Sequence, residues 1–405
     1  MTPDTSIYIH IPFCTHRCAY CDFNTYAGQE AMIPAYVDAL LKEIEYIGSR
    51  QPDFNVPTIF FGGGTPSLLS GPQFDSIMSA LSSAFAVSAD AEVTIEANPG
   101  TISPDKLDAI RKAGINRISF GVQSTVTEEL RMLERTHDFF TVIEAVSTAR
   151  KAGFDNLNLD LIYGLPEQTL SSWQTTVKRI LELQPEHISA YALTLEHGTP
   201  FGKWADRGLL PFPDPDLAAD MYEWTMDFLA KSGYAQYEIS NWAKDDTQQA
   251  SEYGQPSFAC KHNLQYWHSL PYLGLGAGAH GYANNYRYSN ALRIKTYIER
   301  MSSDNRSVTS TFPITPVTVN HHKQSQQDDI SDYMINNLRL VKAGVADSDF
   351  RSRFGGGLLD VFPKEVDELI RTGLLEKKTS DFSEVFRLTR RGRLLGNRVF
   401  LKFIQ

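Results

Sequence analysis

The chain has 405 residues, of which 42% are hydrophobic and 21% are charged, and its net charge is −10 at pH 7. An acidic balance of this size leaves no basic footprint for phosphate groups, which argues against a general nucleic-acid-binding protein. No apolar run approaches the roughly 20 residues needed to span a bilayer, and no secretory signal is visible. We therefore expect a cytoplasmic protein without a transmembrane segment.

Short apolar runs alternate with amphipathic helical patterns up to about residue 240. We expect strands at 7–11, 58–64, 92–99, 117–124, 156–164 and 187–195, with a first helix starting at Pro34. Six β-then-α units in succession predict a parallel sheet with helices outside it.

The expected strands alternate between polar and apolar residues. Glu92, Thr94 and Glu96 alternate with Val93 and Ile95, for example. Strands buried on both faces are usually continuously apolar, so one face of this sheet should line a cavity. The pattern predicts an α/β fold: an incomplete (β/α)6 barrel that is open enough to hold a ligand.

The character of the sequence changes after residue 240. Residues 241–325 are polar, aromatic and glycine-rich and read as an irregular region with a linker, while 326–405 predict a small winged-helix-like α+β module. We therefore divide the chain into 1–240, 241–325 and 326–405. The segment "GAGAHG" (276–281) satisfies G-x-G-x-x-G, but it neither follows a clear strand nor opens a helix, so we do not expect a dinucleotide site there.

Three of the four cysteines lie close together, as Cys14, Cys18 and Cys21 with the spacing C-x3-C-x2-C. Zinc would need a fourth ligand, which His10 or His16 could supply. A [4Fe–4S] cluster held by three thiolates would leave one iron open to another ligand. The position of these cysteines after the first strand of a βα array favours the cluster.

Polar or glycine features also follow the later strands. They are "GGGTPS" (62–67), Glu96, Gln123 and Asp160, with Arg135 on the helical stretch after the fourth strand. Because the carboxyl ends of parallel strands meet at one edge of a barrel, these groups should surround one ligand.

The cysteine spacing resembles that of the radical S-adenosylmethionine (SAM) superfamily. The motifs "YIHIPFC", "FGGGTPS", "EANP", "FGVQS", "LDLIYGLPEQT" and "YALTLEHGTP" together resemble the branch that contains oxygen-independent coproporphyrinogen III oxidase. This resemblance implies a [4Fe–4S] cluster on Cys14, Cys18 and Cys21, SAM at the open iron, and an electron donor such as a flavodoxin. The positions that match SAM contacts in that branch are Tyr8, Tyr20, Gly63, Gly64, Thr65, Glu96, Gln123, Arg135 and Asp160.

The chain departs from the oxidase at Phe23, where the oxidases have a fourth cysteine. It carries instead "HNLQYW" (262–267), which resembles the H-N-x-x-Y-W motif of HemW-type haem chaperones. That resemblance implies haem as a ligand, His262 as its axial ligand, and haem-requiring membrane respiratory proteins as acceptors, with attachment to the inner membrane through those partners.

Several alternatives stay open from the sequence. The chain could be a radical SAM enzyme that acts on a tetrapyrrole, such as coproporphyrinogen III, or a general electron-transfer protein, and whether it cleaves SAM is undecided. The residues of "HNLQYW" could simply anchor an irregular segment. Cys260 could be a thiolate ligand, although a small buried side chain is the simpler interpretation.

Overall fold

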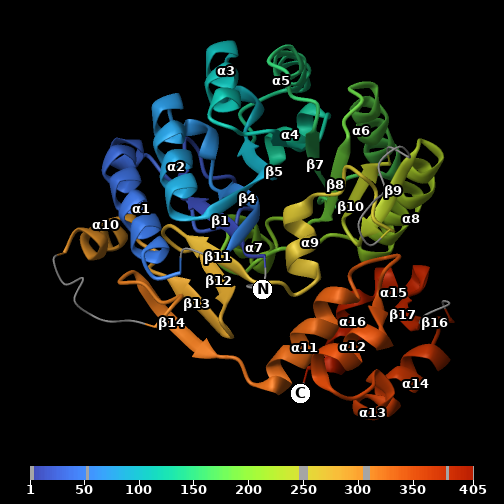
Figure 1. The fold of residues 1–405 in the computed structure, drawn as a ribbon. Coiled ribbons are helices and arrows are strands. Elements are labelled where there is room, and N and C mark those ends of the chain that lie inside the picture. The colour runs from blue at the N-terminus through green and yellow to red at the C-terminus, as the bar shows by residue number, and fades with distance from the viewer. Residues whose placement is uncertain (1–3, 52–53, 246–253, 304–310, 380–382, 405) are drawn as a thin grey trace. The chain divides into compact units, whose positions relative to one another are not determined.

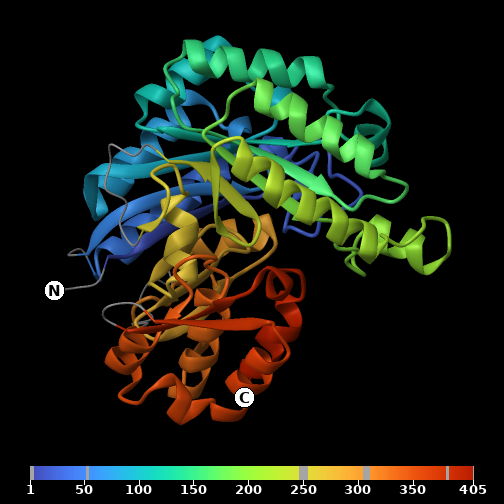
Figure 2. The ribbon, with the colours of Figure 1, turned by 90° about the vertical axis from the view of Figure 1, so that its right-hand side faces the viewer.

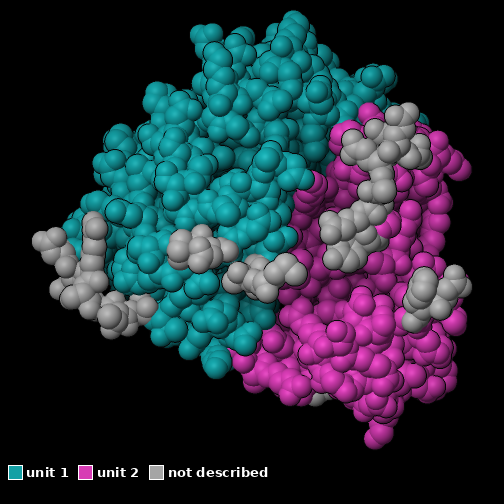
Figure 3. Space-filling model, in the orientation of Figure 1, with its two compact units in different colours: residues 1–221, 271–323 teal, residues 222–270, 324–405 magenta. Residues whose placement is uncertain are grey.

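The computed structural model describes residues 4–51, 54–245, 254–303, 311–379 and 383–404. It divides into two compact units, which Figure 3 shows in different colours. Unit 1 contains residues 1–221 and 271–323, and unit 2 contains residues 222–270 and 324–405. These boundaries differ from the three contiguous segments expected at 240 and 325, because four described strands between residues 272 and 323 join the sheet of unit 1.

The centre of unit 1 is a parallel sheet whose strands are joined by helices. The strands are β1 (Ser6–Ile11), β4 (Asn55–Gly63), β5 (Ala86–Ala97), β6 (Arg117–Gln123), β7 (Leu157–Tyr163) and β8 (His187–Ala192), hydrogen-bonded in that order. The helices are α1 (Ile33–Gly48), α2 (Gly71–Ala84), α3 (Pro104–Lys112), α4 (Thr127–Met132), α5 (Phe139–Lys151), α6 (Leu170–Glu182), α7 (Pro200–Asp206) and α8 (Pro215–Lys231), which crosses into unit 2. Helices α1, α2, α3, α5 and α6 lie along the outside of the sheet in Figure 1, and Figure 2 shows the same layer after a 90° turn.

The local sequence explains these elements. In α1, which begins beside Pro34, the apolar stripe Val37, Leu40, Ile44 and Ile47 is buried, as an amphipathic helix on a sheet requires. The other face of the sheet is polar, as the alternation predicts. Asn158 Nδ2, for instance, donates to Ser119 Oγ at 2.7 Å from the neighbouring strand.

The sheet of unit 1 extends further than the sequence indicated. On the far side of β1 it continues through β11 (Tyr272–Leu275), which is parallel to β1, and then antiparallel through β12 (His280–Ala283), β13 (Tyr286–Asn290) and β14 (Thr318–Lys323). The remaining elements of unit 1 are β2 (Phe13–Cys14), β3 (Tyr26–Ala27), α10 (Ile294–Ser302) and the short 3-10 turns η1 (Glu30–Met32), η2 (Pro66–Leu68) and η3 (Pro99–Thr101). The region expected to be irregular therefore contains several strands, each too short to give a clear period.

Unit 2 combines an antiparallel hairpin, a short helix and the C-terminal module. Its elements are β9 (Tyr234–Glu238), β10 (Asn241–Lys244), α9 (Lys261–Trp267), α11 (Gln326–Asn337), β15 (Val345–Ala346), α12 (Asp347–Phe354), α13 (Leu358–Val361), α14 (Pro363–Arg371), β16 (Leu375–Thr379), β17 (Glu384–Leu388), α15 (Arg390–Leu394), α16 (Gly396–Phe400) and η5 (Leu401–Phe403). The sheet β15-β17-β16 with its flanking helices encloses a core of buried Leu, Val and Phe, which agrees with the small α+β module expected.

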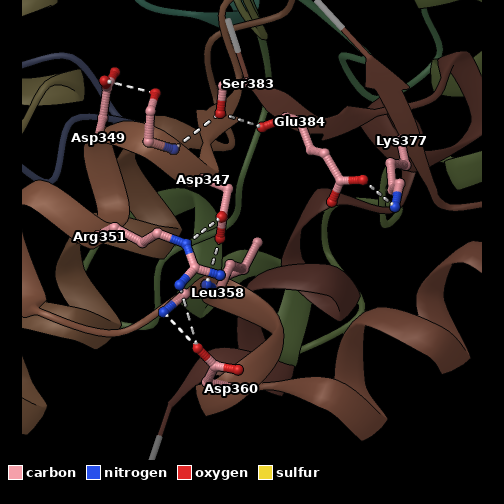
Figure 4. Close-up of polar contacts among 10 residues, drawn as sticks. Asp347, Asp349, Arg351, Leu358, Asp360, Lys377, Ser383 and Glu384 are labelled. Carbon is pink, nitrogen blue, oxygen red and sulfur yellow. Dashed lines mark hydrogen bonds and ion pairs between the residues drawn. The ribbon is translucent and has the colours of Figure 1, made fainter.

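Polar contacts fasten the surface of this module (Figure 4). Asp347, the first residue of α12, accepts from Arg351 Nε and from the backbone N–H of Leu358, each at 2.7 Å. Lys377 and Glu384 form an ion pair across the β16–β17 hairpin. Exposed pairs of this kind each contribute at most about 1 kcal/mol, so the apolar core supplies most of the stability of the module. Among the helices that the structure describes, none combines the length and apolar character needed to cross a bilayer.

Candidate functional site

The three clustered cysteines lie on one loop of unit 1. Cys14 ends β2, and Cys18 and Cys21 follow in a turn closed by a hydrogen bond from Cys21 N to Cys18 O at 3.1 Å. Parallel pairing of β2 with β3, Cys14 opposite Ala27, closes the base of the loop. All three thiols line the same cavity.

Two polar side chains point at these sulfur atoms. Thr65 Oγ1 donates to Cys14 Sγ, and Arg135 Nη1 donates to Cys18 Sγ, each at 3.5 Å. Burial raises the pKa of the Cys14 and Cys21 thiols. Hydrogen bonds and a positive charge oppose that effect and favour thiolates, the form that binds metal.

The cavity has a volume of about 410 Å³ and lies in unit 1 at the carboxyl ends of the central strands. Besides the cysteines, it is lined by these predicted residues: Tyr20, Gly63, Gly64, Thr65, Glu96, Gln123, Arg135 and Asp160. Tyr8 does not line it. The Tyr8 hydroxyl instead bonds to His10 Nδ1 at 2.9 Å.

Gly63, the last residue of β4, and Gly64 give the cavity a wall of backbone atoms. Gly63 has φ +104°, and a Cβ at this position would lie 2.4 Å from the His10 ring; at Gly64 a Cβ would lie 2.6 Å from Phe13 O. Only glycine fits both positions. Gly63 N donates to Glu96 Oε2 at 3.0 Å.

Two carboxyl groups that line the cavity, those of Glu96 and Asp160, interact electrostatically. Burial and the charge of Asp160 raise the pKa of Glu96 to about 8, and burial raises the pKa of Asp160. Asp160 is held by Ser119 Oγ at 2.8 Å and Asn158 Nδ2 at 2.7 Å, and Asn158 is bonded in turn to His187 Nδ1 at 2.6 Å. The alternation of β7 pointed to Asn158, but nothing singled out Ser119 or His187 as its partners.

Gln123 and Arg135 line the cavity beside the end of β6, where the backbone is strained. Gln123 has φ +70°, and the pairing of β6 with β7 shifts register between Gly121 and Gln123. Arg135 Nη2 donates to Gly121 O at 2.6 Å, while the buried Arg135 Nε has no partner among the described residues. Strain of this kind concentrates at functional sites, and an unsatisfied guanidinium N–H fits an incoming carboxylate.

The histidines proposed as alternative zinc ligands are engaged elsewhere. His10 bonds through both ring nitrogens, to the Tyr8 hydroxyl and to Asn24 O, and His16 Nε2 lies 3.3 Å from Glu134 Oε2. Within the described ranges, no three His, Cys, Asp or Glu side chains converge closely enough to hold a single metal ion.

The motif "HNLQYW" forms α9 in unit 2, and the structure places its histidine inside that unit. The side chain of His262 is 1% exposed. Its Nε2 lies 2.9 Å from the Tyr266 hydroxyl, and the two rings are nearly perpendicular at 5.0 Å. A ligand cannot reach Nε2 in this conformation.

The surroundings of α9 are also closely packed. Cys260, at the helix N-terminus, is 1% exposed, which agrees with the simpler interpretation of a buried small residue. The Arg339 guanidinium lies 4.4 Å from the Trp267 ring and 3.6 Å from the buried Glu238 carboxylate. Phe258, before the helix, packs against the core around Tyr237, and residues 246–253 lie outside the described ranges.

Comparison with known proteins gives the class. Residues 8–180 match the Radical SAM superfamily, and residues 324–395 match the HemN C-terminal domain. The parallel sheet, the cysteine loop and these matches define the chain as a radical SAM protein with a HemN-type C-terminal domain. A similar solved structure is that of coproporphyrinogen III oxidase (HemN) from Escherichia coli, a radical SAM enzyme. The match covers 100% of this chain and 90% of the oxidase chain, with a TM-score of 0.82 and 27% sequence identity.

Full-length relatives narrow the family. The protein of Lactococcus lactis named heme chaperone HemW is 36% identical over 399 residues, 98% of this chain and 97% of the relative. The Escherichia coli protein of the same name is 35% identical over 404 residues, 99% of this chain and 98% of its own. The chain belongs to the HemW family.

Proposed function

We propose that this chain is a haem chaperone that binds haem and passes it to haem-requiring membrane respiratory proteins, working in the cytoplasm and reaching the inner membrane through those partners. The observation that carries the proposal is similarity to HemW proteins along the whole chain, which includes both units. Phe23, at the position of the oxidase's fourth cysteine, and "HNLQYW" support it.

The cavity of unit 1 supports a [4Fe–4S] cluster with SAM as resident cofactors. Cys14, Cys18 and Cys21 would hold the cluster, and the fourth iron would be left for SAM. The chemistry that bound SAM would supply begins with its own one-electron reduction. Arg135 Nε offers a donor for the SAM carboxylate, and Asp160 is oriented to accept from ribose hydroxyls. Gly63 and Gly64 admit the ligand close to the backbone.

Haem would bind at α9, with His262 as axial ligand. Because His262 Nε2 is bonded to Tyr266 and the side chain is covered, ligation requires the helix to open first. Haem binding at this site is therefore a two-step event, in which the fraction of open helix limits the apparent affinity.

A haemin titration of the anaerobically reconstituted protein tests the chaperone proposal. We expect saturation of the Soret band near one equivalent, and at least about tenfold weaker binding for His262→Ala, since loss of a metal ligand costs at least as much as loss of its outer contacts. His321→Ala is the matched control, because this histidine is exposed on β14. Equal weakening by both substitutions would indicate adventitious surface binding.

The structural similarity to coproporphyrinogen III oxidase favours one alternative, a radical SAM enzyme acting on a tetrapyrrole. The same reconstituted sample is therefore given coproporphyrinogen III, SAM and a reductant. Conversion of the porphyrinogen with SAM consumption, together with no saturable haemin binding, would replace the chaperone proposal with this one.

A further inference from the structure

The glycine-rich segment 276–281 has a structural position that the proposed cofactors do not explain. It follows β11, contrary to expectation, and leads into β12. Gly276 has φ +97° and Gly278 has φ +79°. It opens a strand and not a helix, so it is not a dinucleotide-binding turn.

The segment contacts the end of the cysteine loop. Asn24, three residues after Cys21, directs its Nδ2 at two carbonyl oxygens, Ala277 O at 3.2 Å and Leu292 O at 3.0 Å. Two acceptors require the amide nitrogen at this position, so the orientation of the side chain is fixed. The carbonyl of Asn24 accepts from His10 Nε2 at 2.9 Å, so Asn24 is bonded through both its side chain and its backbone.

The glycines are required by this contact. A Cβ at Gly278 would lie 2.3 Å from Asn24 Nδ2, and one at Gly276 would lie 2.5 Å from both His10 O and the Tyr36 hydroxyl. Any side chain at these positions would displace Asn24 or the end of β1. The two glycines therefore allow the segment to close against the cysteine loop.

The segment is itself anchored to the helices below it. The buried Tyr36 hydroxyl donates to His10 O at 2.6 Å and accepts from Ala277 N at 2.9 Å. Glu43, fully buried on α1, accepts from Gly276 N at 2.8 Å and from the Tyr297 hydroxyl at 2.6 Å. The segment thus has supports that do not depend on the cysteine loop, as a clamp requires.

We propose that residues 276–278 and Asn24 form a clamp that fixes the cysteine loop and determines how firmly it retains its cluster, with Asn24 as the positioning residue. This inference rests on the proposed cluster. A cluster with three protein ligands has no fourth thiolate to hold it when one sulfur detaches. The β2–β3 pairing closes the base of the loop, and Thr65 and Arg135 bond to its sulfur atoms. The clamp adds a contact at the end of the loop that follows Cys21, where it contributes to preorganisation.

Two substitutions test the clamp. Asn24→Asp keeps the shape but turns an oxygen toward the two carbonyls, and Gly278→Ala pushes a methyl group into Asn24. Gly153→Ala is the matched control, because Gly153 has φ +85° and nothing within 4 Å of a new Cβ. It causes similar backbone strain in the same unit without touching the loop.

Iron release to a chelator is measured on each reconstituted protein, with the electron paramagnetic resonance spectrum of the reduced cluster and thermal unfolding of the cluster-free chain. We expect about tenfold faster release and an altered spectrum for Asn24→Asp and Gly278→Ala, the size of effect that loss of outer contacts to a metal site produces. Gly153→Ala should release iron like the unsubstituted chain, and it should lower the unfolding temperature by its backbone strain alone, and so by less than Gly278→Ala.

The clamp is overturned if both variants keep iron and spectrum as Gly153→Ala does. If Gly278→Ala fails to fold, Asn24→Asp alone decides, because its side chain is only partly buried and its shape is conserved. An unsubstituted chain that takes up no cluster would instead refute the cofactor proposal.

Discussion

The cavity of unit 1 and the α9 helix of unit 2 differ in whether their polar groups already have hydrogen-bond partners. In the cavity, Arg135 Nε has no partner within the described part of the chain, and burial together with the charge of Asp160 opposes ionisation of Glu96. In α9, His262 is bonded to Tyr266 and covered. The cavity carries unsatisfied groups that a ligand would relieve, whereas the helix must give up contacts before it binds one. The first is therefore preorganised and the second is not.

The largest effect expected concerns the cysteines of the preorganised site. Replacing any one of Cys14, Cys18 or Cys21 by Ser should abolish the reconstituted cluster, because no other cysteine is among the residues that line the cavity. Iron and sulfide content measure this loss. Cys260→Ser serves as the control and should retain the cluster, since Cys260 is buried in unit 2. Loss of the cluster in that variant would contradict the three-ligand assignment.

Much of the cavity could be predicted because parallel strands place their carboxyl ends at one edge. Residues as distant in sequence as Gly63, Arg135 and Asp160 meet there for that topological reason. The additional strands β11–β14 were missed because strands of four to six residues give too short a period to detect. The clamp was missed for another reason, since a G-x-G-x-x-G pattern does not reveal what its glycines approach.

The burial of His262 also could not be predicted from the sequence. A histidine in the first turn of a short helix can face solvent or core, and residues 260–264 carry no strong periodicity to decide it. Burial arises from packing within unit 2, where Leu264 contacts the core around Tyr237. Composition predicts which groups can bind haem, but only tertiary packing determines whether they are accessible.

The next effect follows from Glu96, whose pKa of about 8 leaves it largely protonated at pH 7. SAM carries a net positive charge and favours the ionised carboxylate, so binding releases a proton and affinity rises with pH. The expected gain from pH 7 to pH 8.5 is about tenfold, the limit for one proton with this pKa. Isothermal titration with SAM at both pH values measures it.

Glu96→Gln separates this effect from ionisation of the amino group of SAM itself. The variant removes the titrating carboxylate and keeps a side chain of the same shape, so its affinity should depend less steeply on pH. An unchanged slope would assign the pH dependence to the ligand and would indicate that Glu96 does not titrate on binding.

The smallest effect tests the covered histidine directly. In the closed helix, His262 Nε2 must leave the Tyr266 hydroxyl before it can ligate iron. Tyr266→Phe removes that competitor and keeps the ring, so haemin should bind more tightly by about fivefold, which corresponds to about 1 kcal/mol for one hydrogen bond. The Soret titration that measures this gain is repeated with His262→Ala in the Tyr266→Phe background, where the gain should disappear. Weaker binding by Tyr266→Phe alone would show that the hydroxyl belongs to the bound state, and α9 would then be a partly formed haem site, closer in kind to the cavity of unit 1.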